Sequence, residues 1–213
     1  MRFQDRRHAG QVLAALLRVR QEKGALPQPL VLALPRGGVV VAQEVARALQ
    51  APLDVVVTRK VGAPQQPEVG LGAVVGDEPP LFDEEALGEL ALSPQELAPV
   101  VERERAELRR REELYRKGRP APDITGRTAL IVDDGLATGS TARAALRSIR
   151  AQGPEQALLA VPVCSPQAER LLRAEADEVL CVHQPCSFMA VSEWYEDFDQ
   201  VTDDEVLDAL YGT

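Results

Sequence analysis

Long apolar runs, cysteine and positive charge are all in short supply in this sequence. No apolar stretch approaches the roughly 20 residues that a membrane-spanning helix needs. The opening residues, MRFQDRRHAG, lack the features of a secretory signal. Three cysteines are too few for a disulfide framework. We therefore expect a cytoplasmic protein that has no contact with a membrane.

Acidic residues outnumber basic ones, at 33 against 24, and the formal net charge is −9. General binding to DNA or RNA requires a basic surface, so nucleic acid is not an expected partner. Any phosphate site must instead be locally basic or assisted by a metal ion. Only three of the cations are lysines, and one of these, Lys60, follows a strand pattern.

Two kinds of site are disfavoured by missing residues. Cys181, His183 and Cys186 are close enough in the sequence to be considered as metal ligands, but a fourth ligand at suitable spacing is missing. We therefore favour structural cysteines over a metal site. A Walker-type nucleotide loop would need Gly-Lys-Ser/Thr, and the sequence does not contain it.

The stretch at residues 128–141, TALIVDDGLATGST, combines the patterns of a strand, an acidic pair and a phosphate loop. Its apolar run is typical of a buried strand, and a helical pattern follows at residues 142–150. Backbone N–H groups at such a helix start favour a phosphate. Asp133 and Asp134 have the chemistry to accept hydrogen bonds from vicinal sugar hydroxyls. The stretch therefore predicts a site for a sugar and a phosphate within one loop.

A second strand, turn and helix unit occupies residues 30–49. Its turn, Pro35-Arg36-Gly37-Gly38, allows two interpretations. The glycines either only permit unusual backbone angles, or the turn is a second anion site to which Arg36 adds charge. The presence of the first loop favours the second interpretation.

Residues 53–58, LDVVVT, predict a third strand, with Arg59 and Lys60 at its carboxyl end, where open α/β sheets bind ligands. Residues 61–82 are rich in proline and glycine and predict a mobile loop in which 69–75 pairs with 80–82. This segment is either a lid over a substrate or an ordinary hairpin.

Helices flank these units. Residues 5–22 predict an amphipathic helix, capped by Asp5, that packs on the core or on a partner subunit; its Arg6, Arg7 and His8 are expected to be solvated. A capping box at residues 93–96 begins a charged helix that runs to about residue 118. It is either a partly solvated helix or a dimer element, with the pairs Glu107–Arg111, Glu112–Arg116 and Glu113–Lys117.

Strand patterns at 156–163 and 178–183 alternate with a helix at 166–174, which predicts βαβ units and a parallel sheet. The tail from residue 184 ends in a helix at 203–210. We expect Trp194, Tyr195 and Phe198 to form a small core beneath that helix. For Phe188 a ligand-covering role and a packing role both stay open.

Together these segments resemble the type I phosphoribosyltransferase family. LIVDDGLATGST resembles its signature for phosphoribosyl pyrophosphate (PRPP), with hydrophobic residues, two acids and a Thr-Gly-x-Thr loop. ALPRGGVVVA is similar to the family's pyrophosphate loop, and Arg59-Lys60 stands where the family carries phosphate-binding cations. The resemblance covers residues 30–183, and the RKVGAP and YEDF segments are similar to a bacterial subgroup of predicted phosphoribosyltransferases.

The resemblance implies an α/β, Rossmann-like fold with a central parallel sheet flanked by helices, a small hood and a β-hairpin lid. All of residues 1–213 would form one domain. Its core would comprise residues 28–62 and 120–183, the lid and long helix residues 63–119, and the hood residues 184–213 with the helix at 5–22. A homodimer is a further expectation.

The resemblance also implies the chemistry, which is transfer of the phosphoribosyl group from PRPP to a nitrogen acceptor. Mg²⁺ would bridge PRPP oxygens without direct protein ligands. The pyrophosphate loop would contain a non-proline cis peptide. The implied roles are ribose hydroxyl binding by Asp133 and Asp134; 5′-phosphate binding by Ala137, Thr138, Gly139, Ser140 and Thr141; pyrophosphate binding by Arg36, Gly37 and Gly38; catalytic contact with the leaving group by Arg59 and Lys60; and base contact by Phe188.

Two considerations bear on the function that the resemblance implies. Enzymes for 6-oxopurines carry an Asp at the position of Ala137, so the resemblance disfavours hypoxanthine and guanine as acceptors. Some members of the family are regulators, so a PRPP-sensing or nucleotide-sensing protein with little turnover is the alternative function.

Overall fold

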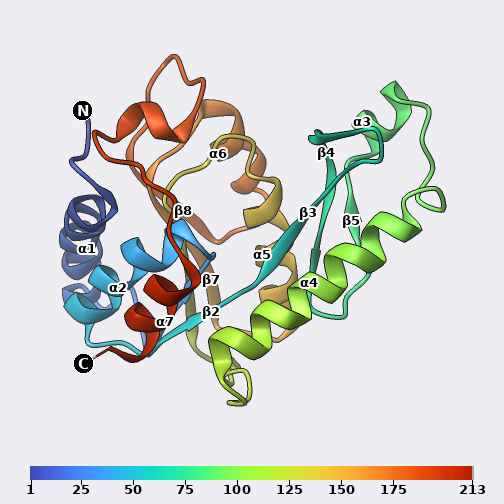
Figure 1. Ribbon diagram of the computed structural model, residues 1–213. Helices are drawn as coiled ribbons and strands as arrows, with labels where there is room; N and C mark the ends of the chain where they lie inside the picture. The colour runs from blue at the N-terminus through green and yellow to red at the C-terminus, as the bar shows by residue number, and fades with distance from the viewer. Residues whose placement is uncertain (213) are drawn as a thin grey trace.

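A five-stranded parallel sheet lies at the centre of the computed structural model, which describes residues 1–212 except for the side chain of Glu68 (Figure 1). The strand order is β2-β1-β6-β7-β8. The strands are β1 (Pro29–Ala33), β2 (Leu53–Val55), β6 (Thr128–Val132), β7 (Gln156–Val163) and β8 (Glu178–His183). This confirms the predicted fold class and the strands predicted at 156–163 and 178–183. These strands were predictable because parallel strands buried on both faces are continuous apolar runs.

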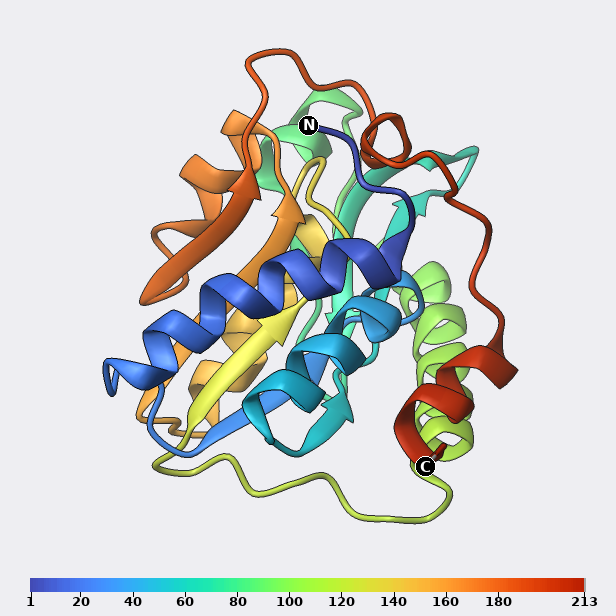
Figure 2. The same cartoon turned by 90° about the vertical axis from the view of Figure 1, so that its left-hand side faces the viewer.

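Helices cover both faces of this sheet. Helices α1 (Arg6–Glu22) and α2 (Gly37–Leu49) lie on one face (Figure 2), where β1 and β6 contribute Val31 and Leu130 to the core. Helices α5 (Ser140–Ala151) and α6 (Pro166–Leu172) lie on the other face, against Leu32 and Ile131. Successive strand residues point to opposite faces, so one apolar run supplies both halves of the core.

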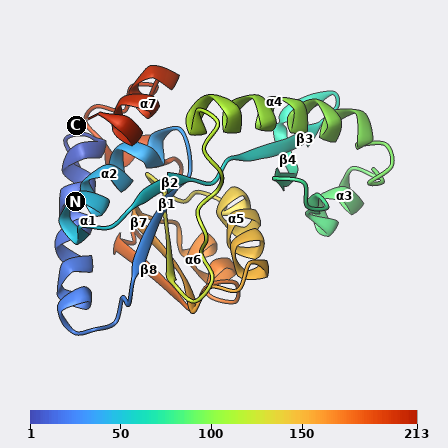
Figure 3. The ribbon, with the colours of Figure 1, turned by 90° about the horizontal axis from the view of Figure 1, so that it is seen from below.

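An arm extends from this core (Figure 3). It comprises an antiparallel sheet of β3 (Thr58–Ala63), β4 (Gln66–Val75) and β5 (Leu81–Phe82), followed by α3 (Glu84–Glu89) and the long helix α4 (Ala98–Arg116). The predicted pairing of residues 69–75 with 80–82 is confirmed by the pairing of Gly72 with Phe82 and of Ala73 with Leu81.

The prediction of one strand over residues 53–58 was wrong. Strand β2 ends at Val55, which pairs with Ala33, the last residue of β1. The N–H of Val56 still donates to the oxygen of Ala33 at 2.9 Å, but the strand pairing does not continue beyond it. The chain then crosses to the arm, where Thr58 pairs with Val75. Arg59 and Lys60 therefore lie inside a strand of the arm and not at the carboxyl end of a strand of the central sheet.

The long helix confirms most of its predicted contacts. Ser93 and Glu96 form the capping box, although the regular helix begins at Ala98. Glu107–Arg111 and Glu112–Arg116 are ion pairs, at 2.8 and 3.7 Å. The third predicted pair was wrong, because Lys117 adopts a left-handed conformation with φ of 50° and places its ammonium 4.6 Å from the Tyr211 ring centre.

The carboxyl-terminal segment folds back over the amino terminus. It contains a short helix η1 (Val191–Trp194) and the closing helix α7 (Asp203–Tyr211), which packs on α2 and α4. Phe3 and Tyr195 pair through their backbones and are both buried, and Trp194 and Phe198 pack against them. The three aromatic residues thus form a small core, with Phe3 as an additional member. The predicted place of this core was wrong, because it packs against the amino-terminal segment, whereas Val206 of α7 belongs to the main core. Among the helices described, none is long and apolar enough to cross a membrane.

Candidate functional site

The loops after β1 and β6 leave adjacent strands and run to opposite faces of the sheet. Ala33 and Val132, the last residues of these strands, pair with each other. The chain after Ala33 enters α2 on one face, and the chain after Val132 leads to α5 on the other. Such a switch point opens a crevice outside the carboxyl ends of the strands, where α/β proteins bind ligands.

The two loops touch each other at the acidic pair. A Cβ atom built on Gly37 would lie only 1.9 Å from Oδ2 of Asp134, and one on Gly38 would lie 2.9 Å from Cα of Asp133. Neither position has room for a side chain. The glycines of the first loop are therefore required by this close approach, and the structure brings together the loop residues that the sequence singled out.

Neither helix at this junction is capped by the side chain of its N-cap residue, although the Thr138 hydroxyl accepts from the N–H of Ser140 at 3.5 Å. The N-cap of α2 is Arg36, which follows a cis peptide bond from Pro35, and the N-cap of α5 is Gly139, with φ of 79°. Neither residue makes a side-chain cap hydrogen bond. The first-turn N–H groups of two helices are thus directed at one crevice, which suits anionic groups. The non-proline cis peptide expected in this loop is present.

Ser165, which has no distinctive signal of a site in the sequence, fixes the position of the predicted phosphate loop at residues 137–141. Its buried hydroxyl donates to the backbone oxygen of Ala137 at 2.6 Å and accepts from the N–H of Ala168 at 3.0 Å. Its own N–H donates to the oxygen of Leu136. The Ser-Pro pair that begins α6 is a sequence signal of a helix N-cap, but nothing in the sequence links it to a loop about thirty residues earlier.

The acidic pair receives a cation from the amino-terminal helix. Arg6 Nε donates to Asp134 Oδ2 at 2.7 Å, and the two side chains are only 11% and 15% exposed. The prediction that Arg6 is solvated was wrong, because the turn before α1 places this residue against the loops. Burial raises the pKa of both Asp133 and Asp134, repulsion by Asp134 adds to the rise at Asp133, and the charge of Arg6 opposes the rise at both.

Tyr195 holds the backbone of the same loop. Its hydroxyl donates to the carbonyl oxygen of Asp134 at 2.5 Å, and the side chain is buried. Burial is the main reason that the pKa of this hydroxyl is raised far above its ordinary value, so it remains a neutral donor. The YEDF segment therefore contacts the site through its tyrosine.

A cleft of about 500 Å³ lies between the phosphate loop and the arm. Thr138, Ser140 and Arg143 line one side, and Lys60 and Gly72 belong to the other. Lys60 extends along Gly70, where an added Cβ would lie 2.4 Å from its Cε. The arm is thus placed to cover the phosphate loop, with Lys60 on the facing side.

Arg59 faces away from this cleft. Its guanidinium donates two hydrogen bonds to Oε2 of Glu104 on α4, at 3.0 and 2.7 Å. Adjacent residues of a strand point to opposite faces, so Lys60 on one side of β3 places Arg59 on the other. The structure therefore does not bring Arg59 together with the two loops.

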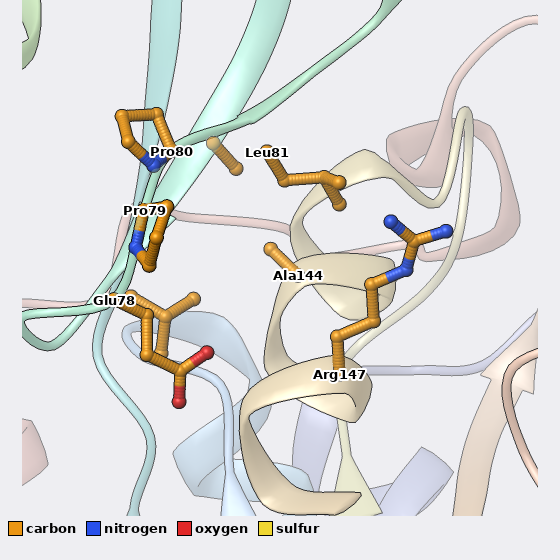
Figure 4. A pocket seen from close by; sticks show the side chains of 8 residues that line it. Glu78, Pro79, Pro80, Leu81, Ala144 and Arg147 are labelled. Carbon is orange, nitrogen blue, oxygen red and sulfur yellow. The ribbon is translucent and has the colours of Figure 1, made fainter. Parts of the chain in front are cut away.

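A second hollow, of about 260 Å³, lies farther along α5 (Figure 4). Glu78 and the prolines of the hairpin form one wall, and Ala144 and Arg147 form the other. Arg147 is bound to Glu175. The lining of this hollow contains no residue of either loop, so the crevice and the larger cleft are the better candidate site.

The remaining candidates lie at the hood. The Phe188 ring stacks on Trp194 at 6.4 Å between centres, which gives this side chain a packing partner. Cys181 Sγ donates to the backbone oxygen of His183, and Cys186 is exposed. Among the side chains that the structure describes, no three from His, Cys, Asp or Glu are grouped as metal ligands.

An α/β fold with a glycine loop and an acid-pair phosphate loop at one switch point defines a nucleotide- or sugar-phosphate-binding class of protein. The chain belongs to the phosphoribosyl transferase domain family, whose sequence profile matches residues 3–199. A Mycobacterium tuberculosis H37Rv protein that is provisionally named a phosphoribosyl transferase is 43% identical over 205 residues, which cover 96% of this chain. The chain spans 45% of that relative's length.

Solved structures support the same fold. The protein TT1426 from Thermus thermophilus is 46% identical, with a TM-score of 0.81 over 99% of this chain and 98% of that one. A purine phosphoribosyltransferase from Pyrococcus horikoshii is 14% identical, with a TM-score of 0.50 over 92% and 93% of the two chains. At that identity the second likeness concerns the fold alone.

Proposed function

We propose that this protein transfers the 5-phosphoribosyl group from PRPP to a nitrogen acceptor, with Mg²⁺ and with release of pyrophosphate. The bond between C1 of the ribose and a pyrophosphate oxygen breaks, and a bond from C1 to the acceptor nitrogen forms. The acceptor loses its N–H proton, and the pyrophosphate leaves with the bonding electron pair. A ribose with positive charge at C1 is the species that the site must stabilise.

The junction of the two loops carries this proposal. Gly37 and Gly38 approach Asp133 and Asp134 so closely that a ligand bound there contacts both loops at once. PRPP has a phosphate, two vicinal hydroxyls and a pyrophosphate on one ring. The start of α5 offers N–H groups to the 5′-phosphate, and the start of α2 offers N–H groups to the pyrophosphate. The carboxylate pair between them suits the two hydroxyls.

We assign the groups of PRPP accordingly. The ribose hydroxyls donate to Asp133 and Asp134, and the 5′-phosphate accepts from the loop at residues 137–141. The pyrophosphate lies against Arg36, Gly37 and Gly38. Lys60 approaches from the arm and adds positive charge. Fixed donors around a leaving anion lower the barrier because no solvent has to reorganise as charge develops.

Magnesium fits this arrangement as a partner of the substrate. Mg²⁺ usually keeps several waters and binds substrate phosphates with few protein ligands. No cage of three acidic, His or Cys ligands occurs in the part of the chain that the structure describes, so the oxygens of PRPP are the ligands we propose. When bound, the ion would neutralise charge on the departing pyrophosphate.

The acceptor is a nitrogen compound, and we propose a nucleobase other than a 6-oxopurine. Ala137 is exposed in the phosphate loop and offers no carboxylate to a base. Phe188, half-buried at the hood, is the aromatic side chain that we propose beside the base. The arm would cover the reacting centre and keep water from hydrolysing PRPP.

One observation favours a sensor on the same fold. Glu104 holds Arg59 on the outer face of the arm, so this cation is not available to a leaving pyrophosphate in the present arrangement. A protein that binds PRPP without turnover needs fewer cations there. Binding and turnover must therefore be measured separately.

Calorimetry of the full chain with PRPP and Mg²⁺ tests the binding step. We expect binding by the wild type, a large loss with Asp133→Asn plus Asp134→Asn, and no change with Asp204→Asn, an exposed aspartate on α7. No binding at millimolar PRPP would refute the proposal. Pyrophosphate release, measured with each nucleobase in turn, tests turnover. If PRPP binds but no base leads to pyrophosphate release, the sensor function is favoured.

A further inference from the structure

Arg6 occupies a position that the proposed reaction does not explain. It reaches from the first turn of α1 to Asp134, a residue 128 positions later in the chain. A Cβ built on Gly37 would also lie 2.8 Å from Arg6 Nε, so the guanidinium lies where the two loops meet. A cation at this place either blocks the ribose site or prepares it.

We propose that Arg6 is a positioning residue that holds the Asp134 carboxylate charged and oriented, with one oxygen left for a ribose hydroxyl. The inference rests on the proposed function and adds to it a residue outside both loops. If Arg6 blocked the ribose site, it would have to leave Asp134 before the sugar binds. A positioning arginine stays in place when the sugar binds.

The surroundings of Arg6 fix its guanidinium independently of any ligand. One terminal nitrogen, Nη1, donates to the backbone oxygen of Asp199 at 2.7 Å. The guanidinium carbon lies 3.8 Å from the centre of the Phe198 ring, within the range of a cation–π contact. Two adjacent residues of the hood therefore hold the guanidinium, and a fixed donor loses little freedom when it orients a carboxylate.

Each of the two carboxylates has one oxygen that accepts a hydrogen bond from the protein and one that can accept from a ligand. Asp134 Oδ2 accepts from Arg6 at 2.7 Å, and Asp133 Oδ1 accepts from the N–H of Asp134 at 2.8 Å. No described residue donates a hydrogen bond to the other oxygen of either side chain. An ionised carboxylate accepts at both oxygens, so two oxygens remain for two vicinal hydroxyls.

Charge explains why the arginine is needed. Asp133 and Asp134 are adjacent, half-buried acids, and burial is the largest cause of the raised pKa of each. The neighbouring groups are Arg6 from α1 and the neutral Tyr195 hydroxyl from the hood, while Glu205 of α7 lies near Arg6. Arg6 is thus the cation that opposes protonation, and a protonated carboxyl loses an acceptor for a hydroxyl.

The test compares Arg6→Met with wild type between pH 6 and pH 8. In the free protein, ¹³C NMR of the aspartate carboxyls should show that the Asp134 midpoint lies at a higher pH in the variant than in the wild type. In calorimetry with PRPP and Mg²⁺, the ratio of variant to wild-type Kd should be larger at pH 6 than at pH 8, because more of the variant's Asp134 is protonated at the lower pH.

Two further variants serve as controls. Arg7→Met removes the adjacent, exposed arginine of the same helix and should change neither measurement. Arg6→Lys keeps the charge without the planar fork and should restore the Asp134 midpoint in large part. If the methionine variant does not fold, Arg6→Gln, which also removes the charge but keeps a polar donor, takes its place in both measurements.

The inference is overturned if Arg6→Met leaves the Asp134 midpoint unchanged, or if it binds PRPP as tightly as the wild type at pH 6. Tighter binding would identify Arg6 as a block. A wild type that binds no PRPP refutes the proposed function alone, because the carboxyl titration is measured without ligand and still decides whether Arg6 holds Asp134 charged.

Discussion

Replacement of Gly37 by alanine tests the contact between the two loops most directly. The new Cβ would lie 1.9 Å from Asp134 Oδ2 and 2.8 Å from Arg6 Nε. Real Cβ contacts essentially never fall below 3.0 Å, so the carboxylate must retreat by about 1.1 Å. Because Arg6 binds that same oxygen, the retreat also disrupts the ion pair.

The size of the effect follows from this displacement. A misplacement of about 1 Å in a group that orients a ligand costs on the order of 100-fold. We therefore expect Gly37→Ala to weaken PRPP binding about 100-fold, which equals about 2.7 kcal/mol. Alanine is the better helix former, and Gly37 begins α2, so the helix itself should not be lost.

Calorimetry with PRPP and Mg²⁺ measures the affinity, and thermal unfolding checks that the variant folds. Gly88→Ala is the matched control, since Gly88 lies in helix α3 with no atom within 4 Å of an added Cβ. The control should bind PRPP normally and be no less stable than the wild type. Wild-type affinity in a folded Gly37→Ala protein would refute the close approach of the loops as the basis of the site.

Two further predictions concern the arm. Glu104→Gln weakens the paired hydrogen bonds of Arg59, so urea denaturation should show a loss of about 1–3 kcal/mol with PRPP affinity unchanged; a large loss of affinity would instead place Arg59 in the site. Arg110 and Arg111 lower the pKa of Glu107 from 4.5 to about 2, so the stability from this carboxylate is complete above about pH 4.5 and is lost as the pH falls towards 2. The urea midpoints of wild type and Glu107→Gln should therefore differ at pH 7 and converge near pH 2, and a constant difference would contradict this origin.

The candidate site was predictable where its signals are local. Asp133 and Asp134 follow an apolar run directly, and the glycine and hydroxyl residues after them precede a helical pattern, so strand, acids and loop are all encoded within fourteen positions. The same holds for Gly37 and Gly38 after the first strand. Parallel strands bring their carboxyl ends to one edge, which is why two separate local patterns predict one crevice.

The sequence did not show that Arg59 and Lys60 point to opposite faces of their strand. Arg59 and Lys60 are adjacent in the sequence and look equivalent there. Their strand belongs to the arm, and alternation along β3 directs Lys60 to the cleft and Arg59 to Glu104. The sequence pattern did not show that the central strand ends at Val55, because Val55, Val56 and Val57 are all apolar and all buried, although only the first is in the strand.

The sequence by itself determined the fold class, the two loops and the acidic pair, because each depends on neighbouring residues and on a regular period. Tertiary structure alone decided the partners of that pair. Arg6 reaches Asp134 across 128 residues, and Tyr195 reaches it across 61, because the amino terminus and the hood pair through Phe3 and pack over the end of the sheet. Contacts of this kind depend on how helices, strands and loops pack against each other, and no local sequence pattern predicts them.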